Sequence, residues 1–307
     1  MELRQLRYFV HVVDSGSMGR AAAELGVVTS ALSQQISRLE GELATRLLQR
    51  TATGVRPTDA GLAFLRQARL ALRHADSATA AAREARLTGQ VSLGLPSSIA
   101  AVLALPLLRA LAERHPGVRL HLVEALSGSL GALINGRTLD LAVVFETESS
   151  RRWSVMPLLD EALYVFGRAD LAGMPGGRTV RLAALAALPL VLPTGLHGLR
   201  AVVNTAFARA RCEPRVVLEV DGLATLMDVV REGLAATIQP GAVAPRVGDE
   251  LRAVRIADAG VRRRSVLASL SDDELSPAAL AVRVTLREVA AELVRQGRWP
   301  GASLHES

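Results

Sequence analysis

Residues 14–43 read DSGSMGRAAAELGVVTSALSQQISRLEGEL, and this stretch decides the fold of the N-terminal part of the chain. Residues 14–17 can end one helix and cap the next, which the pattern places over residues 18–25. Gly26 then permits a sharp turn. From residue 29 to residue 43, apolar residues recur every three or four positions. The sequence therefore predicts a short helix, a tight turn and a second helix.

The second of these helices is predicted to carry a polar face without carboxylates. Its members are Thr29, Ser30, Ser33, Gln34, Ser37 and Arg38. Hydroxyl, amide and guanidinium groups can donate hydrogen bonds to base edges and phosphates, whereas an acidic face would be repelled. The arrangement matches a helix-turn-helix, whose second helix enters the major groove of DNA. On periodicity alone, an ordinary packing unit of three helices remains an equal alternative.

A basic hairpin is predicted directly after this helix. Threonines surround Gly54 between two apolar runs, and Arg50 and Arg56 flank the tip. Beside a helix that reads DNA, such a wing could contact phosphates or the minor groove. For either arginine alone, a solvated side chain is the simpler interpretation. The hairpin and the helix pair together favour DNA.

A long helix is predicted after Thr58, which can cap its first turn. Apolar and small residues repeat along it at spacings of three and four: Leu65, Ala68, Leu72, Ala75, Thr79 and Ala82. This is a heptad seam, and small residues in a seam let two helices approach closely. We expect pairing with a second copy of the chain. Packing of the helix on its own domain is the alternative.

Composition limits what the whole chain can be. The chain has 307 residues, about two domains by size, and half of them are hydrophobic. All 36 basic residues are arginine and the net charge is +6, which permits nucleic acid as a partner. The single cysteine, Cys212, excludes a disulfide framework and a cysteine-based zinc site. Without a signal-like start or a long apolar run, we expect a cytoplasmic protein with no membrane partner.

The C-terminal two thirds of the chain is predicted to be α/β. Short apolar strands alternate with helices from residue 90 to about 300, and the pattern restarts near residue 188. This indicates two lobes built on parallel sheets. We expect residues 155–165 and 261–269 to cross between the lobes, and the helix over 277–295 to return to the first lobe. The basic run at residues 262–264 is interpreted as the solvated start of a strand.

A small-molecule site is predicted between the lobes, because ligands of open α/β sheets bind beyond the carboxyl ends of the strands. Candidate residues are Pro96, Ser97, Ser98, Ser127, Phe145, Thr194, Gly195 and His197. Hydroxyls that face each other across a cleft could hold a small anion. The simpler interpretations are helix caps for the hydroxyls, core for Phe145 and surface for His197.

No motif in the sequence indicates catalysis. The chain lacks GxGxxG after a strand, a P-loop, a GxSxG elbow and HExxH, and its six histidines have no metal-ligand spacing. We therefore expect no catalytic residue, no metal and no cofactor. The alternative to a DNA-binding regulator is a small-molecule-binding α/β protein of receptor or enzyme type that does not bind DNA.

The N-terminal residues carry a family resemblance. The matching positions are Leu3-Arg4-Gln5-Leu6-Arg7-Tyr8-Phe9-Val10, Gly16-Ser17, Ala21-Ala22, Leu25, Val27, Ala31-Leu32-Ser33, Gln35-Ile36, Leu39-Glu40, Leu43, Arg46-Leu47-Leu48, Arg50 and Thr58-x-Ala60-Gly61. In these positions the chain resembles the LysR-type transcriptional regulators. It departs from them at Thr29-Ser30, where the family usually has Gln-Pro, and at Gln34, where many members carry Arg.

The resemblance implies a domain plan and a function. A winged helix-turn-helix domain would cover residues 1–58, a linker and dimerisation helix 59–88, and an effector-binding domain similar to periplasmic binding proteins 89–302. Lobe one would be 89–162 with 267–300, and lobe two 163–266. The protein would bind promoter DNA sequence-specifically as a dimer of dimers, a homotetramer. A small co-inducer or the assembly state would modulate it, and RNA polymerase would be a further partner.

Overall fold

The computed structural model describes residues 1–307 except 52–53, 84–86, 147–152, 196–197, 249 and 306–307. For Arg50, residues 77–83, Arg246 and Asp273 it describes the backbone alone. The described residues form two compact units, Met1–Gly89 and Gln90–Ser307. In the described part of the chain, no helix has the length and apolar character needed to span a bilayer.

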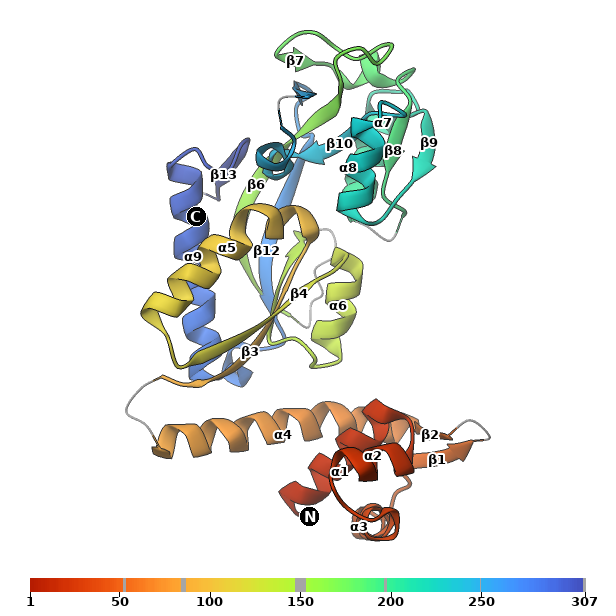
Figure 1. The fold of residues 1–307 in the computed structure, drawn as a ribbon, viewed down its shortest axis with the longest axis vertical. Coiled ribbons are helices and arrows are strands. Elements are labelled where there is room, and N and C mark those ends of the chain that lie inside the picture. The colour runs from red at the N-terminus through yellow and green to blue at the C-terminus, as the bar shows by residue number, and fades with distance from the viewer. Residues whose placement is uncertain (52–53, 84–86, 147–152, 196–197, 249, 306–307) are drawn as a thin grey trace. The chain divides into compact units, whose positions relative to one another are not determined.

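The N-terminal unit is a winged helix-turn-helix followed by a long helix (Figure 1). Its elements are α1 (Leu3–Ser15), α2 (Met18–Glu24), α3 (Thr29–Glu42), β1 (Leu48–Thr51), β2 (Gly54–Pro57) and α4 (Asp59–Arg83). Gly16 ends α1 with φ +65°, which favours glycine, and the hydroxyl of Ser17 accepts from the amide of Arg20 to cap α2. The local signals thus place both helix boundaries, and the predicted helices and hairpin are confirmed.

The core of this unit lies between α1, α3 and α4. Phe9 is fully buried and packs with Ile36 and Leu39 of α3. Two positions of the predicted heptad seam, Leu65 and Ala68, are 8% and 2% exposed within the unit itself. The alternative, packing of the helix on its own domain, therefore applies to these two positions. The next seam residues, Leu72 and Ala75, are half-buried, while the side chains of Thr79 and Ala82 lie outside the described residues.

The C-terminal unit is built on a mixed sheet (Figure 1). The strands, in spatial order, are β4 (Val118–Glu124), β3 (Gly89–Leu95), β5 (Leu141–Phe145), β12 (Arg262–Ser269), β6 (Ser154–Arg168), β11 (Leu251–Ile256) and β7 (Thr179–Val180). β10 (Thr237–Pro240) and β13 (Ala302–Leu304) also pair with β6, and β8 (Leu190–Leu192) pairs in parallel with β9 (Val216–Glu219). The predicted parallel pairing is present between β3 and β5, β8 and β9, and β7 and β11. The sheet is nevertheless mixed, because β6 runs antiparallel to β10, β11, β12 and β13.

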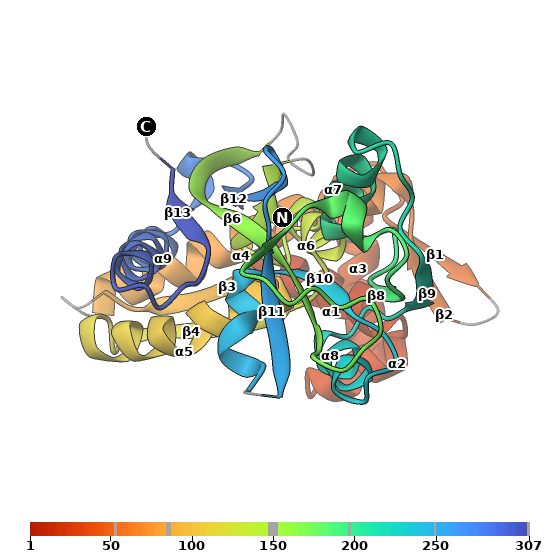
Figure 2. The ribbon, with the colours of Figure 1, turned by 90° about the horizontal axis from the view of Figure 1, so that it is seen from above.

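Strand β6 is shared by both lobes (Figure 1 and Figure 2). Its first part, up to Ala162, pairs with β12, and its last part pairs with β10 and β11. The crossing predicted over residues 155–165 is therefore one continuous strand. The second predicted crossing differs, because β12 pairs with β5 and the first part of β6. Residues 262–266 thus lie in the sheet of the first lobe and not in the second.

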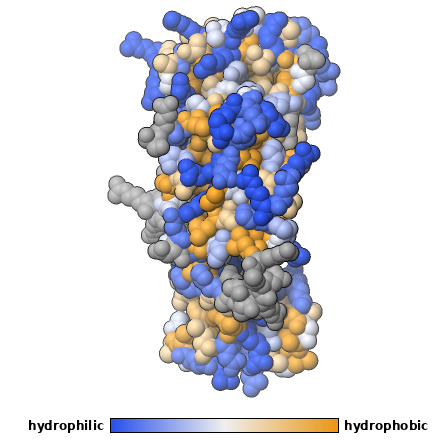
Figure 3. Space-filling model, turned by 90° about the vertical axis from the view of Figure 1, so that its left-hand side faces the viewer, coloured by the Kyte–Doolittle hydropathy of each residue, from blue (hydrophilic) through white to orange (hydrophobic). Residues whose placement is uncertain are grey.

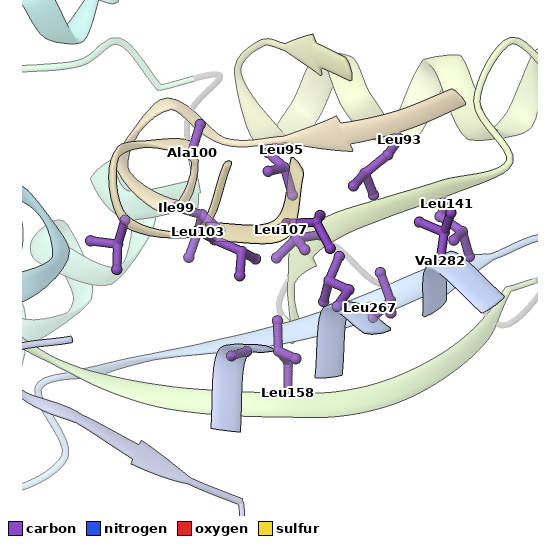
Figure 4. Packing of buried hydrophobic residues seen from close by; sticks show 14 of the residues in the cluster. Leu93, Leu95, Ile99, Ala100, Leu103, Leu107, Leu141, Leu158, Leu267 and Val282 are labelled. Atoms are coloured by element: carbon purple, nitrogen blue, oxygen red, sulfur yellow. The ribbon is translucent and has the colours of Figure 1, made fainter. Parts of the chain in front are cut away.

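Helices cover the sheets and close the cores. They are α5 (Ser97–Arg114), α6 (Ser127–Asn135), α7 (Gly198–Arg209), α8 (Leu223–Arg231) and α9 (Pro277–Arg295), with short 3₁₀ turns at Leu182–Leu185, Gly241–Arg246 and Asp272–Glu274. Figure 4 shows the packing of the first lobe, where Ile99, Leu103 and Leu107 of α5 meet Leu267 of β12 and Val282 of α9. Leu, Val and Ala supply most of this core, as the low aromatic content predicts.

The outer surface of the C-terminal unit is mixed in character. On the side that carries α9, hydrophobic residues lie among hydrophilic ones (Figure 3). Val284 of α9 and Leu105 of α5 are 53% and 58% exposed. Single exposed apolar residues are normal on a folded protein, so this surface does not by itself identify a partner.

Candidate DNA interface and effector cleft

Helix α3 separates its apolar and polar side chains as the sequence predicts. Leu32, Ile36 and Leu39 are buried in the core of the unit. The opposite face presents Thr29, Ser30, Gln34, Ser37 and Arg38 as exposed and Ser33 as half-buried. Arg38 pairs with Glu42 one turn further along, at 3.2 Å, and its side chain keeps 61% of its surface exposed. The six predicted DNA-facing residues therefore share one solvent-accessible face.

The hairpin β1–β2 lies at the end of this unit as a wing. Arg50 pairs with Val55 and Gln49 with Arg56 across the two strands. Val55 turns into the core and Arg56 turns to solvent, as alternation along a strand requires. The side chain of Arg50 lies outside the described residues. The amide of Val55 donates to the carbonyl of Gly16 at 2.9 Å, which ties the wing to the turn between α1 and α2.

Some of the predicted effector residues lie at helix starts, at α5 and α6, whereas Phe145 ends β5 and Thr194 and Gly195 follow β8. Pro96 and Ser127 are buried, Ser97 is half-buried, and Gly195 is exposed. Ser127, at the start of α6, accepts a hydrogen bond from the amide of Gly198, at the start of α7, at 3.3 Å. This bond brings a helix of the first lobe to a helix of the second. His197, which directly precedes α7, lies outside the described residues.

The other hydroxyls of the predicted cleft also have partners within the protein. Thr194 donates through its hydroxyl to the carboxylate of Asp221 at 2.9 Å, and its amide donates to the same oxygen at 2.9 Å. Ser98 accepts from the guanidinium of Arg263 at 3.0 Å. The N-cap of α5 is Pro96, so Ser98 is not the helix cap that the simpler interpretation suggested.

The prediction that Arg263 belongs to a solvated basic run is wrong. Arg263 is 0% exposed, and its Nε donates to the carboxylate of Glu161, also 0% exposed, at 3.0 Å. The indole of Trp299 donates to the other carboxylate oxygen at 3.0 Å, and the guanidinium lies 4.3 Å from the centre of the Phe145 ring. Phe145 is therefore core, in contact with a buried cation.

Strand alternation explains the error. Neighbouring residues of β12 point to opposite sides of the sheet, so the middle arginine of the run turns inward while its neighbours turn outward. Arg264 pairs with Asp160 at 2.9 Å and with Glu146 at 3.3 Å. The hydrogen bond that Arg264 donates to the carboxylate of Asp160 raises the pKa of Arg264 above its usual value. Among the described residues, no group of three or more His, Cys, Asp and Glu side chains could hold a metal ion.

Comparison with known proteins agrees with this architecture. Residues 3–62 match the family described as the bacterial regulatory helix-turn-helix protein, lysR family, and residues 84–291 match the LysR substrate binding domain. The nitrogen assimilation regulatory protein nac of Klebsiella aerogenes is 37% identical over 80% of each chain. That of Escherichia coli is 33% identical over 97% of this chain and 98% of its own.

Solved structures agree as well. The crystal structure of CbnR, a LysR family transcriptional regulator, superimposes with a TM-score of 0.68 at 26% identity and covers 94% of this chain and 99% of its own. Full-length CbnR complexed with its target DNA gives a TM-score of 0.67 at 27% identity, over 95% of this chain and 100% of that one. The chain therefore belongs to the LysR family of DNA-binding transcriptional regulators.

Proposed function

We propose that two copies of the chain place their α3 helices in successive major grooves of promoter DNA. The observation that carries this proposal is the exposed polar face of α3 opposite its buried apolar face. Thr29, Ser30, Ser33, Gln34, Ser37 and Arg38 would face the bases and the adjoining backbone, and Arg50 and Arg56 of the wing would contact phosphates or the minor groove. CbnR, which has the same fold, has been solved in complex with its target DNA.

The assembly and the regulation follow from the same plan. The linker helix α4 would pair two chains beyond Ala68, where Leu72 and Ala75 are only half-buried within one chain. Two such dimers would form a tetramer that acts in the cytoplasm and alters recruitment of RNA polymerase. Ser98, Ser127 and Thr194 would sense a small co-inducer by exchanging their present hydrogen bonds for bonds to the ligand.

The first test is the salt dependence of DNA binding. The affinity for the double-stranded fragment upstream of the protein's own start codon should fall linearly with salt on logarithmic axes, with a slope of about −0.9 for each phosphate contact. Affinity that does not change with salt, for this fragment and for random duplex, would reject the proposed DNA-binding surface.

The specific contacts are tested by the double variant Ser33→Ala/Gln34→Ala. Each lost base contact should weaken specific binding by about 1–3 kcal/mol, because the base edge loses its hydrogen-bond partner. Binding is measured on the preferred fragment and on random duplex, and the loss should be confined to the preferred one. Gln67→Ala, a change at an exposed residue of α4, is the control. A double variant with an unchanged footprint would show that another face reads the DNA.

A further inference from the structure

Helix α3 carries a buried carboxylate at the border between its apolar face and the predicted DNA face, where Glu40 follows Ser33 and Ser37 along the helix. Glu40 is 7% exposed. Its Oε1 accepts from the amides of Leu47 at 2.8 Å and Leu48 at 2.9 Å, and its Oε2 accepts from Nη1 of Arg46 at 3.1 Å. A buried carboxylate is costly unless donors satisfy it. Here the donors belong to the segment that leads into the wing.

The same segment is held from its other side by the start of α4. The hydroxyl of Thr58 donates to the carbonyl of Arg46 at 2.8 Å, and the amide of Thr58 donates to the carbonyl of Leu47 at 2.9 Å. A Cβ at Gly61 would lie 2.0 Å from that carbonyl oxygen, so α4 packs directly on the backbone there. The amides of the wing base are thus bound by α3, and its carbonyls by α4.

A cavity of about 520 Å³ adjoins this base. Ser33, Ser37 and Glu40 line it from α3, and Leu48 and Gln49 line it from β1. The position of the wing relative to the polar face of α3 is set by these attachments at the base, by the bond from Val55 to Gly16, and by the packing of Val55 and Leu48 on the core.

We propose that Glu40 is a positioning residue for DNA recognition. Its carboxylate accepts hydrogen bonds from the amides of Leu47 and Leu48 and so fixes the first wing strand relative to α3. The wing arginines and the polar face of α3 can then contact the same DNA duplex. This inference rests on the proposed function, because it needs Arg50 and Arg56 to contact DNA. For this role the side chain at position 40 must be long enough to accept from both amides, and its charge is not needed.

Two conservative variants distinguish the effect of side-chain length from the effect of side-chain charge. Glu40→Gln keeps an oxygen acceptor at the same distance but loses the charge, whereas Glu40→Asp keeps the charge but shortens the side chain. Loss of a negative charge should by itself favour binding to DNA. Glu24→Gln supplies the matched charge control, because Glu24 lies on α2 with 52% of its side chain exposed and its ion-pair partner is His11, not a wing residue.

The measurements are the salt slope of binding to a random-sequence duplex and amide exchange at Leu47 and Leu48. Glu40→Gln should bind like Glu24→Gln. Glu40→Asp should exchange those amides faster and lose about 0.9 of slope for each phosphate contact that the wing no longer makes. Within an Arg50→Ala/Arg56→Ala background, Glu40→Asp should remove no further slope, since the contacts that it affects are already absent.

The outcomes distinguish the two proposals. If Arg50→Ala/Arg56→Ala leaves the slope unchanged, the wing does not contact DNA and both the wing contacts and the role of Glu40 are rejected. If that variant lowers the slope but Glu40→Asp binds like the unmodified protein, only the role of Glu40 is rejected. The role of Glu40 is also rejected if Glu40→Gln binds weakly while Glu40→Asp binds normally. It is rejected as well if Glu40→Asp lowers the salt slope by the same amount with and without Arg50 and Arg56.

Discussion

Arg263→Met is expected to lower the free energy of unfolding of the C-terminal unit by roughly 3–5 kcal/mol. The variant leaves the carboxylate of Glu161 fully buried without its counter-charge. It also removes the donor to Ser98 and the cation over the ring of Phe145. The cost arises mainly from the unpaired buried charge, because an intact buried pair contributes little net stability over apolar residues of the same size.

Tryptophan fluorescence during urea unfolding measures this effect directly. The chain has two tryptophans, Trp153 and Trp299, and both belong to the C-terminal unit. The control is Arg262→Met, at the exposed neighbour on the same strand, which should change stability by no more than about 0.5 kcal/mol. In the double variant Arg263→Met/Glu161→Gln, part of the lost stability should return, because no unpaired charge remains. Equal midpoints for Arg263→Met and the unmodified protein would contradict the buried pair as a constraint on the fold.

Local signals predicted the DNA-binding unit well, because the residues that begin and end each of its elements lie next to that element in the sequence. Gly16 and Ser17 mark one helix boundary, and the apolar spacing along α3 identifies its buried face. The spacing leaves Glu40 ambiguous, because it stands four positions after the apolar Ile36 but three positions after the polar Ser37. What the spacing could not supply was the partner, which comes from the backbone of the wing base.

The interior of the C-terminal unit depended on pairings between distant segments. Arg263 lies directly opposite Glu161 in the ladder between β12 and β6, a pairing that no local pattern encodes. The alternation of side chains along a strand could have shown that the middle arginine of the run faces inward, but not what it meets. The heptad seam is ambiguous for a different reason. The same spacing suits a dimer and a helix packed on its own domain, and Leu65 is used for the latter.

The N-terminal unit has its own most sensitive position at Phe9. Phe9→Ala is expected to lower the free energy of unfolding of this unit by about 3–5 kcal/mol. The ring is fully buried, meets Phe64 edge-on with 5.2 Å between centroids, and packs with Ile36 and Leu39 of the reading helix. Domains are stable by only about 5–15 kcal/mol, so for a small unit near the lower end of that range such a loss removes most of the stability.

The consequence for DNA binding separates Phe9→Ala from the contact variants. Loss of Phe9 should weaken specific and random-duplex binding by the same factor, because it depletes the folded unit and removes no individual base contact. Amide exchange in α1 and α3 should rise, while the tryptophan-reported transition of the C-terminal unit should not move, because the described residues that pack with Phe9 all belong to the N-terminal unit. Leu3→Ala, at a residue of the same helix that is 49% exposed, is the control and should leave both readouts unchanged. A Phe9→Ala protein that kept full affinity for both duplexes would mean that α3 holds its orientation without the core beneath it.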